Sequence, residues 1–276
     1  MTHPDINLGK VAQFIADVAD RDVMPAFQNL SPDQVYEKQA GEIVTEVDVT
    51  AERHLAALLT GYLPGSHVLG EESFEDDPSL MDLCMSDEPV WIIDPIDGTQ
   101  NFSRGNPHFA MMVTYRQARE TQAAWIYDPV NELMYSAAKG KGAQFNGRPI
   151  TRCASDHALD QQTGSLGSRL NKAHRAAIEQ GITGLPKTRD RLRCCGQEYL
   201  SLVRNEIQFL QYGVRLKPWD HAPGVLIAAE TGCYAAFLAD ETTYDASRGI
   251  ADGYLMIAQN RESWLGLRQA LWDIHT

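Results

Sequence analysis

The chain has 276 residues, and its 43% hydrophobic and 22% charged residues are typical of a soluble globular protein with one large domain or two smaller ones. No apolar run approaches the roughly 20 residues that cross a bilayer, so we expect neither a membrane partner nor a signal peptide. The formal net charge of −13 argues against nucleic acid as the main ligand. Five cysteines without a zinc-binding spacing predict reduced thiols and a cytoplasmic location.

The first part of the chain alternates helical and extended patterns. Apolar residues at helical spacing predict an amphipathic helix over about 6–24, and extended segments follow at 34–38 and 43–45. A second helix is expected after Asp48, for which the simplest role is that of an N-cap. Lys38, in the first extended segment, would ordinarily be a solvated surface charge.

Acidic residues follow two of the expected strands. The apolar run 90–93 predicts a buried strand that ends at Asp94, because Pro95 has no N–H with which to continue the ladder. Asp97 follows three residues later. The glutamate pair 71–72 follows another apolar strand and a glycine in the same way. We therefore expect several carboxylates at one edge of a sheet.

Beyond Asp97 the chain offers groups that suit an anion. Gly98 lets the backbone approach a ligand closely, and a helix that opens at Thr99 would present free N–H groups. A strand, two acids and the start of a helix thus lie within ten residues. This combination predicts a metal ion bound to a phosphate group.

The middle of the chain predicts an antiparallel meander, with the earlier helices covering one face. Turn-forming sequences separate its four short strands, which lie at 109–115, 123–127, 133–138 and 143–145. The polar segment 151–162 then marks a boundary. We expect two parts: residues 1–150 with an antiparallel sheet and most metal ligands, and residues 151–276 with a smaller mixed α/β sheet and Asp220.

Helical and extended patterns alternate beyond the boundary, which indicates an α/β half and an α+β chain overall. An Ala-rich helix is expected near its centre, with Pro223 in its first turn and Gly232 past its end. The remaining helices are predicted at 171–179, 198–204 and 263–272. The strands are predicted at 164–168, 191–195, 207–212, 233–238 and 254–257.

The candidate site is a set of acids expected at strand ends or helix starts. Its members are Glu71, Glu72, Asp94, Asp97 and Asp220. If they converge, their like charges need compensation, and the nearby cations in sequence are few, chiefly Lys38 and Lys217. Carboxylates are ligands that Mg²⁺ prefers, and it shares its shell with substrate phosphate. No cluster of His or Cys in the sequence suggests zinc instead.

These groups would suit phosphoryl transfer to water. Asp94 could bridge two metal ions roughly 4 Å apart, which clamp the attacking and leaving oxygens of an in-line displacement. Glu72 could accept the proton of the attacking water, and Thr99 with Asp48 could orient that water. The amides of Gly98 and Thr99 would hold phosphate oxygens. Such a reaction needs mostly positioning and charge stabilisation.

Separate motifs occur in the order found in a known family. They are Val44–Asp48, Gly70–Glu72, Trp91–Phe102, Tyr127–Pro129, Gly140–Ala143 with Asn146–Ile150, and Lys217–Gly224. Together they resemble the inositol monophosphatase family, within the group that includes fructose-1,6-bisphosphatase and 3′(2′),5′-bisphosphate nucleotidase. The resemblance covers nearly the whole chain. It implies a layered αβαβα sandwich that is usually dimeric, activity that depends on Mg²⁺, and inhibition by Li⁺.

The resemblance also implies roles for the residues that occupy the motif positions. Two or three Mg²⁺ ions are expected per site. One would be held by Glu71, Asp94 and the carbonyl of Ile96. A second would be held by Asp94, Asp97 and Asp220, and a third, weaker ion would lean on Glu71 through water. Glu72, Thr99 and Asp48 would form the network around the nucleophilic water. Phosphate or substrate contacts are assigned to Asp97, Gly98, Thr99, Lys38, Ser165, Tyr199 and Arg215.

Two positions depart from the family pattern. Inositol enzymes often carry an acid seven residues before the last metal aspartate, where this chain has Gly213. The family usually has small residues where this chain has 197–199, Gln-Glu-Tyr. The substrate is therefore left open among an inositol phosphate or related monoester, a nucleotide bisphosphate, fructose 1,6-bisphosphate and histidinol phosphate. A third hypothesis is a partner-binding regulatory protein with secondary catalysis.

Overall fold

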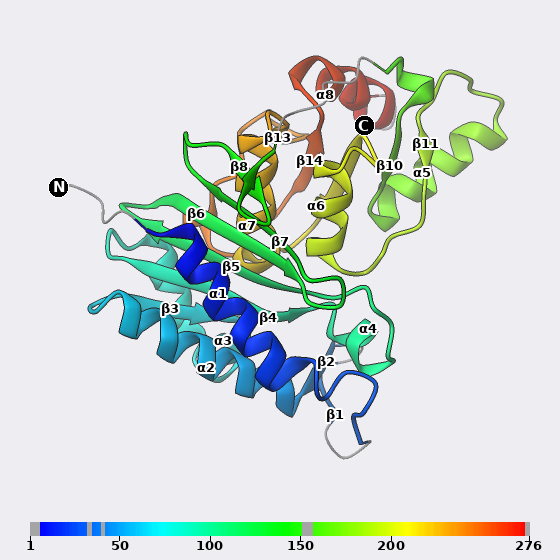
Figure 1. The fold of residues 1–276 in the computed structure, drawn as a ribbon. Helices are drawn as coiled ribbons and strands as arrows, with labels where there is room; N and C mark the ends of the chain where they lie inside the picture. Colours follow the sequence, from blue (N-terminus) through cyan, green and yellow to red (C-terminus); the bar gives the residue numbers. More distant parts are fainter. Residues whose placement is uncertain (1–5, 32–34, 40–41, 151–156, 274–276) are drawn as a thin grey trace.

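The computed structural model describes residues 6–31, 35–39, 42–150 and 157–273, without the side chains of residues 37–39, 42 and 43. Figure 1 shows two main sheets, with helices between them and on their outer faces. Within the described ranges, none of the helices has the length and apolarity that crossing a bilayer requires.

The larger sheet has seven strands in the order β3-β4-β5-β6-β7-β8-β9, parallel only between β3 and β4. Its consecutive antiparallel strands form the expected meander. The strands are β3 (His67–Gly70), β4 (Val90–Asp97), β5 (Ala110–Gln117), β6 (Glu120–Asp128), β7 (Leu133–Ala138), β8 (Ala143–Phe145) and β9 (Arg148–Pro149). A separate antiparallel pair precedes it, formed by β1 (Val35–Gln39) and β2 (Glu42–Thr45).

The smaller sheet has five strands in the order β11-β10-β12-β14-β13. β10 pairs in parallel with both β11 and β12, whereas β14 is antiparallel to β12 and β13, so the sheet is mixed. Its strands are β10 (Thr163–Ser165), β11 (Lys187–Thr188), β12 (Phe209–Gly213), β13 (Tyr234–Phe237) and β14 (Tyr254–Ala258).

The helices fill the spaces that the two sheets define. The longer ones are α1 (Leu8–Val18), which continues as a π-helix over Ala19–Val23, α2 (Glu46–Tyr62), α5 (Ser168–Glu179), α6 (Cys195–Val203), α7 (Pro218–Glu230) and α8 (Arg261–Arg268). Short helices are α3 (Glu71–Asp76) and α4 (Thr99–Ser103). Single turns or 3₁₀ and π segments occur at Pro78–Met85, Leu159–Gln161, Ala246–Arg248 and Gln269–Asp273.

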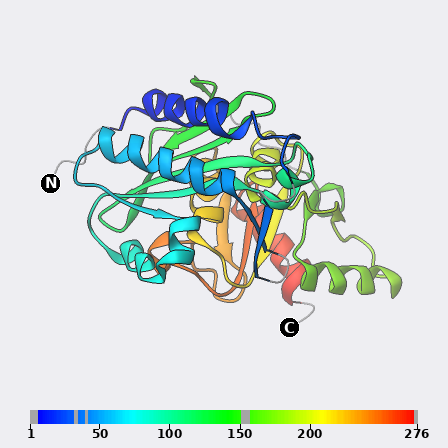
Figure 2. The same ribbon diagram turned by 90° about the horizontal axis from the view of Figure 1, so that it is seen from below.

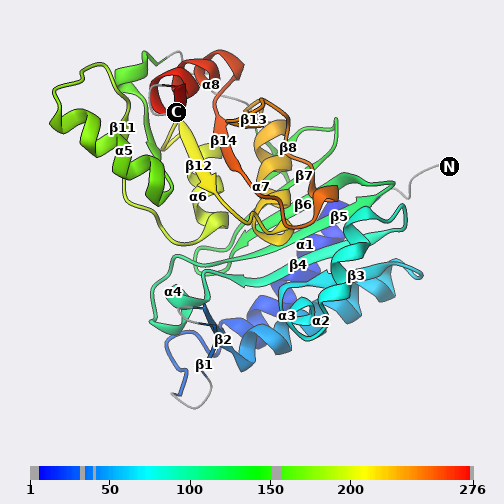
Figure 3. The same ribbon diagram turned by 180° about the vertical axis from the view of Figure 1, so that it is seen from behind.

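Among the described residues, three of the four buried apolar clusters lie between the layers. α1 and α2 lie side by side on one face of the larger sheet, where Ile15 and Leu55 meet Trp91 and Trp125 (Figure 2). α6 and α7 occupy the space between the two sheets and share one core with both (Figure 3). α8 packs on the far face of the smaller sheet around Trp264. The layers are helix, sheet, helix, sheet and helix, which confirms the predicted fold class.

Three local predictions are wrong for identifiable reasons. β4 does not end at Asp94 but runs to Asp97, because a register irregularity between these residues takes Pro95 out of the ladder. The segment 191–195 is not a strand, since it forms the connection into α6. α7 begins at Pro218, so Pro223 lies inside the helix rather than in its first turn.

Asp48 is also not the N-cap of α2. Thr45 is the N-cap, and Asp48 is the third helical residue, whose carboxylate accepts the Thr45 N–H at 2.9 Å in a capping box. This places the acid inside the first turn and fixes its side chain against the backbone.

Gly224 of α7 provides a stability test of the middle layer. A Cβ atom there would overlap the ring of Tyr199, which is fully buried on α6. We expect Gly224→Ala to lower the free energy of unfolding by about 1–3 kcal/mol or more in urea titrations, because the two helices cannot stay at their present separation. Gly266→Ala in α8, where no atom lies within 4 Å of the added methyl, is the matched control and should be neutral or stabilising.

Candidate active site

Three acids from distant parts of the chain meet at the ends of three elements. Glu71 begins α3, Asp94 lies near the end of β4, and Asp220 lies in the first turn of α7. One carboxylate oxygen from each lies within 4.8 Å of the other two. The ammonium of Lys217 lies 3.4 Å from Glu71 Oε1. The structure thus brings these three predicted ligands together, with the ammonium group of Lys217 beside them.

The carboxylates are poorly solvated for groups of like charge. Asp94 is 1% exposed, and its burial, together with Glu71, Asp97 and Asp220, raises its pKa well above the usual range. Desolvation and the charges of Glu71 and Asp97 raise the pKa of Asp220 in the same way. Ionisation of all three carboxyl groups is unfavourable without added positive charge. Such a set of oxygen donors suits a hard divalent cation. The donor set therefore fits Mg²⁺.

Asp97 is held by the segment that leads into α6. Its Oδ2 accepts the N–H of Gly196 at 2.5 Å and the thiol of Cys194 at 3.0 Å. Burial nevertheless raises the pKa of Asp97 to about 6, against these hydrogen bonds, which lower it. The carboxylate of Asp97 is thus already hydrogen-bonded to the start of α6, and a metal ion would share it with these donors.

Asp48, Thr99 and Ile96 form one hydrogen-bonded group. The Thr99 hydroxyl lies 3.1 Å from Asp48 Oδ1 and 2.9 Å from the Ile96 carbonyl oxygen, so its proton can be donated to either. Burial raises the pKa of Asp48 to about 6. The structure brings together these three predicted residues, which come from α2, α4 and β4.

Glu72 is almost fully buried beside Glu71, and its backbone is fixed by a residue that the sequence analysis missed. Glu52 of α2 accepts the N–H groups of Glu72 at 2.7 Å and Ser73 at 2.8 Å, and thereby caps α3. Its position four residues after Asp48, on the same face of α2, was the available signal.

The backbone conformation and the neighbouring atoms both require a glycine at position 98. It lies at φ 89° as the N-cap of α4, and a Cβ atom would come within 3.0 Å of the His108 carbonyl oxygen. Asn101, also missed, donates from its amide to the carbonyls of His108 at 2.7 Å and Leu192 at 2.9 Å. α4 is therefore tied to the segment that precedes α6.

The residues predicted to contact the substrate lie in different environments. The Lys38 side chain lies outside the described residues. Ser165 is fully buried, with no hydrogen-bond partner for its hydroxyl among the described residues, and Arg215 is exposed with φ 52°. Tyr199 is fully buried, and its hydroxyl lies 3.2 Å from Nδ1 of His221. The geometry connects Tyr199 with α7 rather than with solvent.

Comparison with known proteins adds a family relationship. The model of the inositol monophosphatase family matches residues 7–273. Nus factor SuhB of Vibrio cholerae is 30% identical over 255 residues, which cover 90% of each chain. Fructose-1,6-bisphosphatase/inositol-1-monophosphatase of Thermotoga maritima is 31% identical over 71% of this chain and 72% of its own. Inositol monophosphatase of Dictyostelium discoideum is 30% identical over 83% and 85%.

Solved structures share the fold at lower identity. A Thermotoga maritima IMPase is 22% identical with a TM-score of 0.78, and the match covers 97% of both chains. Inositol monophosphatase II of Staphylococcus aureus is 24% identical with a TM-score of 0.76, covering 97% of this chain and 93% of that one. Identities this low support the fold alone.

The raised carboxyl pKa values predict an unusual pH dependence of stability. Folding raises the pKa of Asp48 and that of Asp97 from 3.8 to about 6. Between about pH 4 and 6, the folded chain therefore holds protons that the unfolded chain releases. Without divalent ions, the free energy of unfolding should therefore fall by roughly 2–5 kcal/mol as pH rises through this window. Urea titrations in EDTA at pH 5 and 7 would measure this change.

The matched variant for this measurement is Asp94→Asn, which removes one of the crowded charges. In EDTA at pH 7 it should be more stable than the unaltered chain, and the difference should shrink at pH 5. Added Mg²⁺ should raise the stability of the unaltered chain more at pH 7 than at pH 5. A variant that is less stable at pH 7 in EDTA would contradict the electrostatic account.

Proposed function

Since the chain belongs to the inositol monophosphatase family and is a phosphoric monoester hydrolase, we propose that it hydrolyses a small phosphate monoester with Mg²⁺ by in-line attack of water. The observation that carries the proposal is the approach of Glu71, Asp94 and Asp220 to within 4.8 Å of one another. In such a set, Glu71, Asp94 and the Ile96 carbonyl would hold one ion. Asp94, Asp97 and Asp220 would hold a second, and a third would lean on Glu71 through water.

When bound, the ions supply positive charge that offsets the acids, polarises the phosphoryl group and favours deprotonation of water. The protein groups do the positioning. Thr99 and Asp48, whose side chains lie 3.1 Å apart, would orient the attacking water, and Glu72 would accept its proton. The N–H groups of Gly98 and Thr99 would bind phosphate oxygens, which the left-handed backbone of Gly98 supports.

The substrate is proposed as a small alcohol phosphate rather than as inositol phosphate specifically. At Gly213, an added Cβ would lie 2.8 Å from the ring of Tyr254, so an acidic side chain has no room there unless that ring moves. Arg169 donates to the Tyr254 hydroxyl at 3.0 Å, which brings a cation to this ring. Nucleotide bisphosphates, fructose 1,6-bisphosphate and histidinol phosphate remain the alternatives. One relative is named for both fructose-1,6-bisphosphatase and inositol-1-monophosphatase.

A partner-binding role remains the second candidate, because one relative matched over 90% of both chains is named a Nus factor. We further propose a cytoplasmic homodimer that is inhibited by Li⁺, on the strength of the family membership. In a purely partner-binding protein, metal-dependent turnover would be absent.

The decisive experiment is phosphate release from a panel of monoesters and bisphosphates, with and without Mg²⁺ and Li⁺. Turnover is expected only with Mg²⁺, and Asp94→Asn should lower kcat/KM by about 10³-fold or more, because it removes a shared metal ligand. Asp87→Asn, an exposed surface carboxylate, is the matched control and should keep full activity. Undiminished or metal-independent turnover by Asp94→Asn would refute the mechanism.

Thr99 allows a finer test of how the water is oriented. Thr99→Ser keeps the hydroxyl that contacts Asp48 and Ile96, whereas Thr99→Ala removes it. We expect Thr99→Ala to lower kcat by about 10²-fold and Thr99→Ser to retain most activity. Equal losses in the two variants would assign Thr99 a packing role. Thermal unfolding of both variants would check that α4 stays intact.

A further inference from the structure

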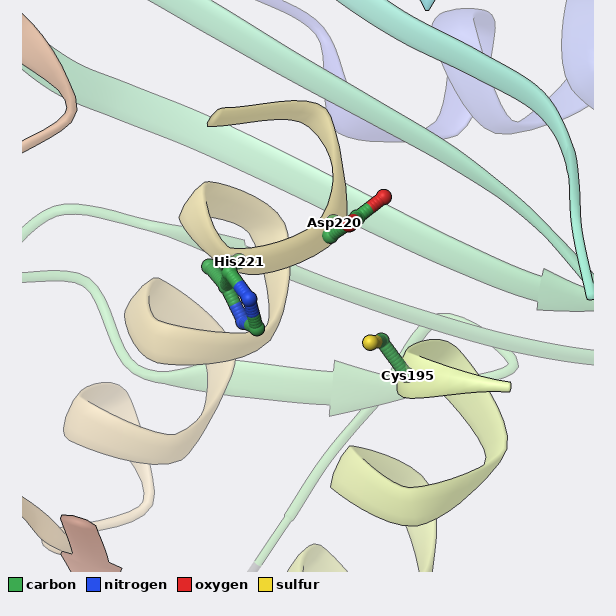
Figure 4. Close-up of side chains that lie close together, drawn as sticks. All are labelled: Cys195, Asp220 and His221. Atoms are coloured by element: carbon green, nitrogen blue, oxygen red, sulfur yellow. The ribbon is translucent and has the colours of Figure 1, made fainter. Parts of the chain in front are cut away.

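A cysteine and a histidine lie beside one of the acids of the site. Cys195 is the first residue of α6, and Asp220 and His221 are in the first turn of α7. One potential ligand atom from each side chain lies within 4.8 Å of those of the other two. Figure 4 shows the Cys195 sulfur pointing from the start of α6 toward this turn of α7. The proposed Mg²⁺ chemistry uses neither Cys195 nor His221.

The three donors differ in kind from the all-oxygen set of Glu71, Asp94 and Asp220. A thiolate, an imidazole nitrogen and a carboxylate oxygen are ligands typical of Zn²⁺, which Mg²⁺ does not prefer. Tetrahedral zinc, with bonds of about 2.0–2.3 Å, holds its ligand atoms about 3.3–3.8 Å apart. The present spacing is at most 4.8 Å, so zinc binding would require the partly buried side chains of Cys195 and Asp220 to rotate toward each other and toward His221.

The ring of His221 is held by a residue of α6. Its Nδ1 lies 3.2 Å from the hydroxyl of Tyr199, a fully buried residue one turn after Cys195 on α6. Hydrogen bonds of this kind fix the ring orientation of metal-binding histidines. Tyr199 therefore serves as a positioning residue that couples the two helices on which the three donors lie.

We propose that Cys195, Asp220 and His221 form a zinc site that inhibits the enzyme by withdrawing Asp220 from the Mg²⁺ set. On binding, the Cys195 thiol loses its proton to solvent and the sulfur forms the metal bond. The fourth position is left to water. Because Zn²⁺ would draw the Asp220 carboxylate toward Cys195 and His221, it would compete with Mg²⁺ held by Asp94, Asp97 and Asp220.

Zinc binding is measured directly by equilibrium dialysis of the full chain, stripped of metal, against buffered Zn²⁺. Cys195→Ser and His221→Val should each weaken binding by at least about tenfold, since each removes one of three ligands. Cys233→Ser is the matched control, because this cysteine lies after α7, next to Thr231, and should leave zinc affinity unchanged. Equal affinity in the unaltered chain and Cys195→Ser would overturn the proposal.

Cobalt gives a readout that does not depend on activity. Co²⁺ bound by the unaltered chain should show a thiolate-to-cobalt charge-transfer band that Cys195→Ser lacks and Cys233→Ser retains. Absence of this band in the unaltered chain would also overturn the proposal, even if cobalt binds through oxygen ligands elsewhere. Neither measurement needs turnover, so failure of the proposed phosphatase mechanism would be seen separately, in the phosphate-release assay.

Inhibition links the site to catalysis. Micromolar Zn²⁺ should suppress Mg²⁺-dependent phosphate release, and higher Mg²⁺ should relieve it. Residual activity of Cys195→Ser should require at least about tenfold more Zn²⁺ for half inhibition, relative to its own zinc-free rate. Zinc inhibition with the same half-inhibition concentration in both proteins would place the inhibitory ion on the acids alone and overturn this part.

Discussion

The repulsion among buried carboxylates is the constraint on which the rest of the structure depends. Asp94, Asp97 and Asp48 are each at most 8% exposed, and Asp220 lies next to Asp94. Such a group is stable only if the surrounding fold is rigid enough to hold it or if cations neutralise it. The large apolar core on one face of β4, which contains Trp91 and Ile93, and the smaller cluster on the other face, which contains Val90 and Ile92, provide the first condition. The set of carboxylates suits the second condition, neutralisation by cations, because divalent ions bind such ligands.

Local backbone features, and not packing alone, fix the positions of the acids. A register irregularity in β4 separates Asp94 from Asp97, a capping box fixes Asp48, and Glu52 holds the amides at the start of α3. These features involve β4, the first turns of α2, and the start of α3. The site is therefore a product of the tertiary structure, although each of its parts has a recognisable local pattern.

Much of this could be predicted from the sequence, because the strongest signals are local. Alternating apolar patterns and turn residues located the meander, and strand ends followed by acids located Glu71, Asp94 and Asp97. The missed features depend on contacts across the fold. Glu52 is buried only because α3 is placed above it, and Cys195 approaches His221 only because α6 and α7 pack together. The register irregularity that includes Pro95 was misread as a strand end, since a bulge and a strand terminus look alike in sequence.

Two hydrogen bonds described above join β4 and α4 to the start of α6 and to the connection that precedes it. The amide of Gly196 reaches Asp97, and the side chain of Asn101 reaches the carbonyl of Leu192. A shear of the smaller sheet against the larger would be transmitted through these links to the last residue of β4 and to α4. The relative position of the two sheets thus affects the position of Asp97. A change in the position of α6 would therefore act directly on Asp97, although α6 itself carries none of the five predicted acids.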